Sequence, residues 1–137
     1  MGARRLGREL ALQVLYALDL NPMDTRRFLL TFWEQNPSPP EARSYAGLLV
    51  EGVVARREEL DLLIKSKAQH WALPRMARVD LNLLRLAAYE LLYRDDVPKK
   101  VVINEAIEVA KKYGSEDSSA FVNGILDEFA VPEGKAE

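Results

Sequence analysis

The sequence predicts an all-α fold, a compact bundle of about seven helices in a single domain over residues 1–137. Apolar residues recur at three- and four-residue spacing along most of the chain, as on one face of an α-helix. Long alternations of polar and apolar residues, which would indicate strands, are nearly absent. The expected connections are short, so no segment is long enough to act as an interdomain linker.

Prolines, capping residues and a glycine divide the helical pattern. Asn21-Pro22 ends the first helix, and Asp24 is a candidate N-cap for the second. Three prolines in the segment 36–40 predict a loop. Gly114 follows two lysines that suit the negative end of a helix, where a C′ glycine is expected. The helices are expected over residues 4–20, 24–35, 41–67 with a break near 56–57, 78–94, 99–113 and about 115–129.

The later part of the chain carries three more local expectations. The segment 78–94 holds two adjoining apolar stripes and is expected to be the central core helix. Ser115 or Asp117 is the candidate N-cap of the last helix. Gly124 inside that helix costs about 1 kcal/mol relative to alanine, and close approach of another helix is the explanation we favour. The chain ends, residues 1–5 and 131–137, are candidates for flexible segments.

The residue inventory gives little support to catalysis. The absence of cysteine excludes disulfides and a thiol nucleophile, and a single histidine, His70, excludes a multi-histidine metal site. The scattered glycines form no phosphate-binding loop, and adjacent carboxylates on a helix do not converge on one atom. For His70, beside Trp71, a surface or packing role is favoured. We therefore expect no enzyme activity, no cofactor and no metal.

The chain has no apolar run of the ~20 residues needed to span a bilayer and no secretory signal pattern. A cytoplasmic protein without a membrane partner is expected. The net charge of −2 conceals an asymmetry: residues 1–100 carry 16 basic and 13 acidic side chains, and residues 101–137 carry 3 and 8. This excludes a uniformly basic nucleic-acid-binding protein but leaves room for a local basic patch.

Arg4, Arg5 and Arg8 form the first candidate patch. Positive charge at a helix start opposes the helix dipole, which suggests that a partner uses these side chains. Arginine matches phosphate and stacks on exposed bases, so RNA contact stands beside a solvated first turn as an interpretation of these residues. Arg75 and Arg78 offer a second basic element, and the sequence leaves open whether the two elements lie side by side.

Several motifs resemble one known family, that of the transcription antitermination factor NusB. The strongest are Ile103-Asn-Glu-Ala-Ile107, Ala110-Lys-Lys-Tyr-Gly114 and Phe121-Val-Asn-Gly-Ile-Leu-Asp127. Two more resemble the family's first and central helices: Arg8-Glu-Leu-Ala-Leu-Gln-Val-Leu-Tyr16 and Leu84-Arg-Leu-Ala-Ala-Tyr-Glu-Leu91. The motifs stand in the family's order, and the similarity covers about residues 3–130, with little over 21–45.

The resemblance implies an all-α fold of about seven helices and a non-enzymatic factor. In the family, this factor pairs with NusE, a small-subunit ribosomal protein. The pair recognises the single-stranded boxA element of nascent RNA, chiefly in ribosomal RNA leaders. Together with RNA polymerase and other Nus factors it suppresses termination. Some family members form homodimers, and the sequence leaves open whether this chain does.

The resemblance also implies site residues. Family RNA contacts match Arg4, Arg5, Arg8, Arg78, Asp117 and Phe121. Positions on the NusE-facing surface match Tyr16 and Asp80. One position that is arginine in some relatives is Leu6 here. Structural roles stand beside these: a core position for Phe121 and Tyr16, and a helix cap for Asp117.

Two other functions remain open at this point. One is an RNA-binding helical module, related to the NusB-like domain found fused to ribosomal RNA methyltransferases, that delivers ribosomal RNA to a separate modification enzyme. The other is a helical protein-interaction or homodimer module with no RNA role. Loss of affinity with rising salt that depends on the N-terminal arginines would indicate a phosphate partner and exclude the last of these.

Overall fold

The computed structural model describes residues 2–137, and Met1, in the segment expected to be flexible, lies outside the described residues. The described chain forms seven α-helices and one 3-10 turn and contains no strand, which confirms the expected all-α class. The elements are α1 (Ala3–Leu20), α2 (Thr25–Gln35), α3 (Pro40–Ala55), α4 (Arg57–Lys67), η1 (Leu73–Arg75), α5 (Arg78–Tyr93), α6 (Lys99–Tyr113) and α7 (Ser118–Asp127).

The expected helix boundaries agree closely with those observed. The long segment 41–67 does break near its paired arginines, because Arg56 leaves helical geometry between α3 and α4. Asp24 caps α2 as predicted, since its side chain accepts a hydrogen bond from the backbone N–H of Arg27 at 3.0 Å. At α7 the expectation is wrong in detail. Asp117 occupies the N-cap position but its side chain makes no capping hydrogen bond, whereas the Ser118 hydroxyl accepts one from the backbone N–H of Ser115.

The two glycine expectations near the C-terminus also need correction. Gly114 ends α6 in an extended conformation rather than with positive φ. It is required for space instead, because a Cβ there would overlap Ser118 and lie 2.8 Å from the carbonyl oxygen of Ala110. Gly124 faces open space, with nothing within 4 Å of the place of a Cβ, so no helix approaches it closely.

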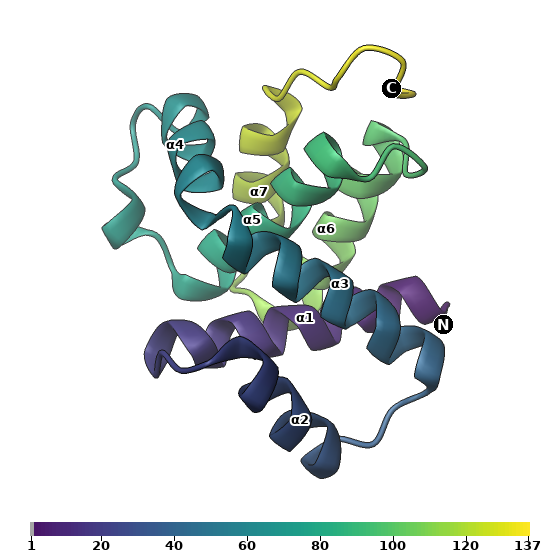
Figure 1. The fold of residues 1–137 in the computed structure, drawn as a ribbon. Helices are drawn as coiled ribbons and strands as arrows, with labels where there is room; N and C mark the ends of the chain where they lie inside the picture. The colour runs from purple at the N-terminus through teal and green to yellow at the C-terminus, as the bar shows by residue number, and fades with distance from the viewer. Residues whose placement is uncertain (1) are drawn as a thin grey trace.

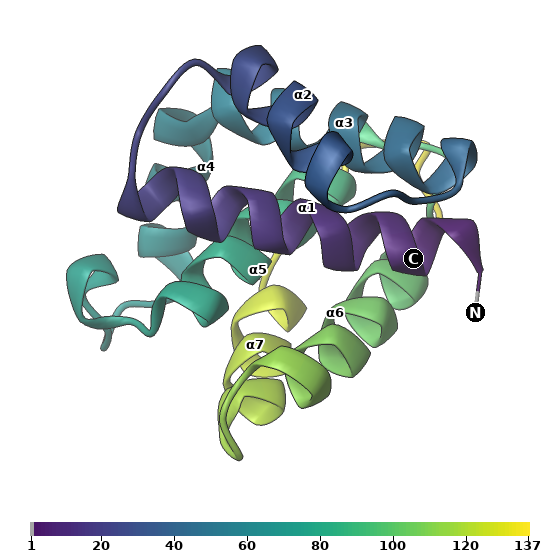
Figure 2. The same ribbon diagram turned by 90° about the horizontal axis from the view of Figure 1, so that it is seen from below.

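The helices pack around α5. Helices α1 and α3 lie side by side and run in the same direction, and α6 and α7 form an antiparallel pair on the other side of α5 (Figures 1 and 2). The close crossing of α1 and α3 depends on Gly7, where a Cβ would lie only 3.1 Å from the carbonyl oxygen of Ala42 and from the Tyr45 Cβ. Among the fully buried side chains are Leu12, Leu49, Leu60, Leu84, Leu91 and Leu126.

A second close approach joins α3 to α5. Gly52 faces the ring of Tyr89, and a Cβ at Gly52 would overlap that ring. Tyr89 therefore fills the space that a larger residue at Gly52 would occupy.

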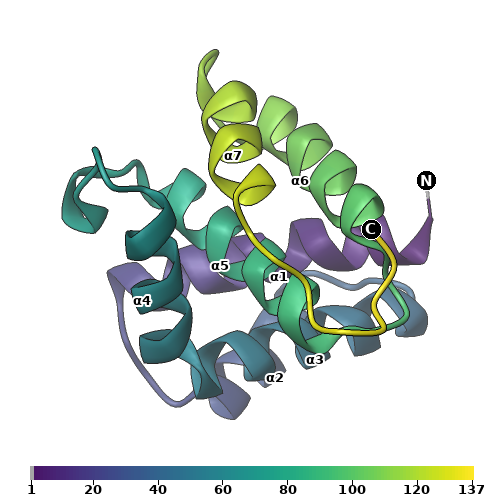
Figure 3. The same ribbon diagram turned by 90° about the horizontal axis from the view of Figure 1, so that it is seen from above.

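The C-terminal segment after α7 runs back across α5 to the start of α6 (Figure 3). The backbone N–H groups of Lys99 and Lys100 donate to the carbonyl oxygens of Ala136 and Glu137. The buried Lys135 ammonium donates to the carbonyl oxygens of Glu90 and Arg94 at the end of α5. The bonds to Lys99 and Lys100 satisfy N–H groups that the start of α6 leaves unpaired, and the Lys135 bonds fasten the C-terminal segment to the end of α5.

Candidate nucleic-acid interface

The three N-terminal arginines lie on the first two turns of α1, and each is paired with an acid from a distant part of the chain. Arg8 is buried, with only 7% of its side chain exposed. Its Nε and Nη2 donate to the two carboxylate oxygens of Glu90 at 2.7 and 2.8 Å. The Tyr45 hydroxyl donates to the same carboxylate at 2.6 Å, and burial, together with that charge, raises the pKa of Tyr45 to about 12. Arg8 therefore has a structural role, as the buried ionic partner of Glu90.

Arg4 and Arg5 are more accessible than Arg8. Arg5 makes a two-pronged contact with Glu105, and the hydrogen bond and charge from Arg5 hold the pKa of that carboxyl below its usual value. Arg4 donates to Asp96 at 2.6 Å, and about half of each side chain is exposed. Arg4, Arg5 and Arg8 border a shallow cleft of about 430 Å³ next to the loop before α6. The positive charge at this end of α1 is therefore largely matched by acids.

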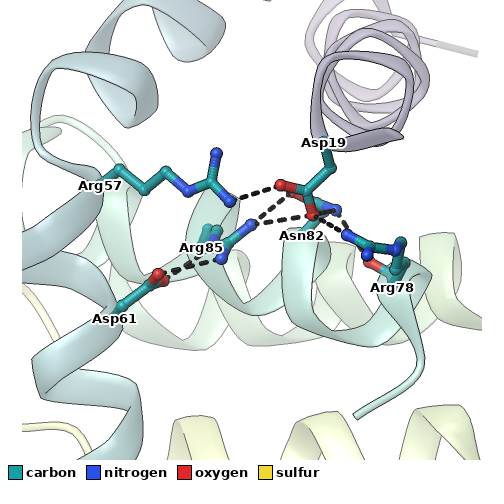
Figure 4. A network of polar contacts seen from close by, with 6 residues as sticks. All are labelled: Asp19, Arg57, Asp61, Arg78, Asn82 and Arg85. Atoms are coloured by element: carbon teal, nitrogen blue, oxygen red, sulfur yellow. Dashed lines mark hydrogen bonds and ion pairs between the residues drawn. The ribbon is translucent and has the colours of Figure 1, made fainter. Parts of the chain in front are cut away.

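Arg78, at the start of α5, lies in a second network, centred on Asp19 near the end of α1 (Figure 4). The Asp19 side chain is only 2% exposed. Its Oδ1 accepts from Arg57, and its Oδ2 accepts from Arg78 and Arg85 at 3.2 Å each and from the Asn82 amide at 3.1 Å. One carboxylate therefore joins α1, α4 and α5.

The Asp19 network carries more positive than negative charge. Arg85 is buried and makes a two-pronged contact with Asp61, at 2.7 and 2.9 Å. Arg57 and Arg78 are about half exposed, and each gives one N–H to Asp19. Together with Lys65 they border a cleft of about 490 Å³ whose apolar lining includes Leu73, Pro74 and Leu81. Exposed guanidinium groups at such a cleft suit phosphate.

The electrostatics of Asp19 follow from its partners. Burial alone would raise the pKa of this carboxyl, but the hydrogen bond from Asn82 and the charges of Arg85, Arg57 and Arg78 outweigh burial and hold the pKa below its usual value. Asp19 stays ionised at neutral pH as a result, and it keeps the three arginines in place.

The two basic elements lie at opposite ends of α1 (Figure 2). Helix geometry puts about 20 Å between Arg5 and Asp19 along the axis of α1. The structure therefore answers the question left open by the sequence: the N-terminal arginines and Arg78 are not neighbours. A ligand that touches both must extend along the helix.

The predicted residues of α7, Asp117 and Phe121, lie at the start of that helix. Asp117 is exposed at the start of the helix, and Phe121 is half-buried one turn later. Phe121 meets the ring of Trp71 edge to face, with ring centroids 5.4 Å apart and planes at 87°. In the sequence, Trp71 stands out only as the neighbour of His70. No sequence signal links Trp71 to Phe121, since the pair forms only when α4 and α7 pack.

Tyr16 and Asp80, the predicted partner-protein contacts, differ in accessibility. Tyr16 is 38% exposed on α1, between apolar positions that are buried. Asp80 is buried in the first turn of α5, where a negative charge suits the helix dipole. Its Oδ1 is buried without a hydrogen-bond partner. The exposed Leu20 and Met23 follow Tyr16 along the chain.

The described residues show no cluster of histidine, cysteine or carboxylate side chains able to hold a metal ion. Over residues 2–137 no helix combines the length and the apolar character that a membrane span requires. His70 is exposed and borders a cleft together with Trp71.

Comparison with known proteins gives one consistent family. The model of the NusB family matches residues 5–131. A transcription antitermination protein NusB of Geobacter sulfurreducens is 56% identical over 131 residues, which cover 95% of each chain. The solved NusB of T. maritima superposes with a TM-score of 0.85 at 35% identity, covering 97% of this chain and 95% of that one. A structure described as antitermination factors NusB and NusE in complex with dsRNA matches with a TM-score of 0.81 at 31% identity, covering 93% and 95%.

Proposed function

Because the chain belongs to the NusB family of non-catalytic transcription antitermination factors, we propose that it binds boxA-type single-stranded RNA in nascent ribosomal RNA transcripts together with NusE. The proposed complex includes RNA polymerase and other Nus factors. Action on nascent transcripts would take place in the bacterial cytoplasm, the compartment expected from the sequence. The family also accounts for the lack of catalytic constellations in the sequence.

The observation that supports RNA binding most directly is the surplus of guanidinium groups around Asp19. Arg78 and Arg57 keep N–H groups beyond the one each gives to Asp19, and both are about half exposed. Such groups can pair with a phosphate without breaking a buried ion pair. A solved relative at 31% identity is described in complex with NusE and double-stranded RNA, which supports the same ligand class.

The six proposed RNA residues divide by accessibility. Arg4, Arg5 and Arg78 can reach RNA phosphate from the surface. Arg8 is proposed to act indirectly, by fixing the start of α1 through Glu90. The remaining two, Asp117 and Phe121, lie at the start of α7, where Phe121 can meet a base and Asp117 moderates affinity by repelling phosphate.

For the NusE surface we propose a face that includes Tyr16 and Asp80. The exposed ring of Tyr16 can be covered by a partner. The unpartnered Oδ1 of Asp80 carries a desolvation cost, which a donor from a docked protein could remove if Asp80 shifts slightly. Because RNA and NusE would contact neighbouring parts of one molecule, each should tighten the binding of the other by the same factor.

The test is fluorescence anisotropy of labelled boxA RNA against a scrambled RNA, with and without purified NusE, at two salt concentrations. We expect tighter, boxA-selective binding in the presence of NusE. Arg78→Ala should weaken binding by up to about tenfold and lower the salt slope by about one. Arg26→Ala, which removes a highly exposed arginine on α2, is the matched control and should change little.

The other outcomes separate the alternatives. Equal binding to both RNAs would contradict boxA recognition and leave a general RNA-binding module, such as one that delivers ribosomal RNA to a modification enzyme. No RNA binding, with NusE shown to be folded, would contradict the proposal and favour a protein-interaction or homodimer module. Sedimentation of the free chain distinguishes a homodimer from a monomer.

A further inference from the structure

Trp71 presents a large aromatic ring to solvent in the loop between α4 and η1. The residue is 57% exposed. Isolated exposed apolar residues are common on protein surfaces, so exposure alone carries no function. Trp71, however, is held in place. Its backbone N–H donates to the Ala68 carbonyl oxygen at 2.9 Å, and its ring meets the edge of Phe121 at 5.4 Å between centroids.

The surroundings of Trp71 are cationic. The ring borders a cleft of about 720 Å³ whose charged lining consists of Lys65 and Arg75, with no carboxylate. His70 and Gln69 supply the remaining polar side chains of that lining. This cleft adjoins the one at the Asp19 network, since Lys65 and Ala72 line both. Cationic side chains thus line the surface from Arg78 to the tryptophan, and Asp19 and Asp61, the carboxylates of the second cleft, are paired with arginine.

We propose that Trp71 is a base-stacking residue that holds one unpaired base of a bound single-stranded RNA, with Lys65 and Arg75 placed to meet the flanking phosphates. An aromatic ring beside cationic side chains is the combination by which proteins hold single-stranded nucleic acid. The inference rests on the proposed function and extends it, because it adds a nucleotide subsite that the sequence did not indicate.

The lining of the cleft favours RNA over a protein partner. Its apolar residues besides Trp71 are only Ala68 and Ala72. Alanines bury little area, and protein interfaces usually surround an aromatic anchor with larger apolar groups. The absence of carboxylates in the lining suits a polyanion.

The chain offers a direct spectroscopic test because it contains two tryptophans, Trp33 and Trp71. In Trp33→Phe, Trp71 is the only tryptophan of the chain. Addition of boxA RNA and NusE should quench its emission and protect it from acrylamide, since a stacked base covers the ring. The matched control is Trp71→Phe, in which the remaining Trp33, on α2 against Phe32, should not respond. A titration of NusE and RNA without the chain supplies the blank.

Affinity measurements complete the test. Trp71→Ala should weaken RNA binding by about tenfold, in line with the loss of one stacked base. Trp71→Tyr should retain most of the affinity, because it keeps an aromatic face. Leu62→Ala, at an exposed position of α4, should have no effect. Circular dichroism establishes that each variant is folded.

Three outcomes would overturn the inference. If wild-type protein binds boxA RNA while Trp71 emission and the Trp71→Ala affinity stay unchanged, the inference fails and the proposed function stands. If Trp71→Ala weakens NusE binding in the absence of RNA and leaves RNA binding of the free chain unchanged, Trp71 belongs to a protein interface. If the wild-type protein binds no RNA, the proposed function and the inference fail together, and the wild-type measurement identifies that case.

Discussion

At the start of α1, three arginines meet three carboxylates from α5, α6 and the loop between them, whereas at the junction of α4 and α5 three arginines share Asp19 and Asp61. In the first arrangement each of the three arginines has a carboxylate, Arg8 is buried, and Arg94 also contacts Asp96 at 3.3 Å. In the second, three arginines share two carboxylates, and two of the guanidinium groups are half exposed. A run of arginines in a sequence therefore does not measure the charge available to a ligand. The acids that fold against it decide how much remains.

This comparison predicts a large stability difference between neighbouring arginines. Arg8→Ala should lower the free energy of unfolding by about 3–5 kcal/mol, because it leaves Glu90 buried without its ionic partner. Arg4→Ala should cost about 1 kcal/mol or less, because Arg4 and Asp96 are both about half exposed. Urea unfolding at neutral pH measures both values. Equal losses for the two variants would contradict the structural role of Arg8.

The second prediction concerns the Asp19 network. Asp19→Asn should lower the free energy of unfolding by about 2–4 kcal/mol at pH 7, since three arginines lose a buried carboxylate. The folded-state pKa of Asp19 is depressed, so its contribution is present above the usual carboxyl pKa of about 4 and is lost as the pH falls through the folded pKa.

Urea unfolding of wild type and Asp19→Asn as a function of pH checks this expectation. The two curves should be separated at neutral pH and converge in acid. Asp24→Asn is a suitable control, because that carboxylate caps α2 with a single backbone hydrogen bond and asparagine caps equally well. A gap between wild type and Asp19→Asn that does not narrow as the pH is lowered would show that the effect is not electrostatic.

The smallest predicted effect concerns Asp96, the partner of Arg4 at the start of α1, and is a change in RNA affinity. Asp96→Asn removes the acid that neutralises Arg4 while leaving an exposed, similarly shaped side chain. RNA affinity at low salt should rise about twofold, because one more arginine becomes available to phosphate. Anisotropy against boxA RNA at low and high salt measures it. A decrease in affinity would mean that Asp96 holds Arg4 in its binding position.

The helices were predictable because their apolar spacing is a local property. The break at Arg56 and the cap at Asp24 follow from neighbouring residues. The partners of the N-terminal arginines were not predictable, since Asp96 and Glu105 lie 92 and 100 residues away from Arg4 and Arg5. The close helix contact expected at Gly124 was wrong because it also depends on distant residues. The spacing within a helix does not tell which element packs against a given position.

The candidate site also contains residues that the sequence predicted and residues that it did not. The resemblance to the family indicated Arg78 and Phe121, whose contacts the structure then supplied. Trp71 lacked such a motif, and its contact with Phe121 exists only in the packed fold. Asp19 also gave no signal, because an acid at the end of a helix is usually solvated and nothing local shows three arginines converging on it.

The fit between Gly52 and Tyr89 has a consequence for how this chain can change over generations. Because a Cβ at Gly52 would overlap the far end of the Tyr89 ring, a replacement of the glycine requires the half-buried Tyr89 side chain to move. A smaller residue at Tyr89 would open a void beside Gly52. The residues at the two positions are therefore expected to vary together: among descendants of this chain, a larger residue at position 52 should be accompanied by a smaller one at position 89.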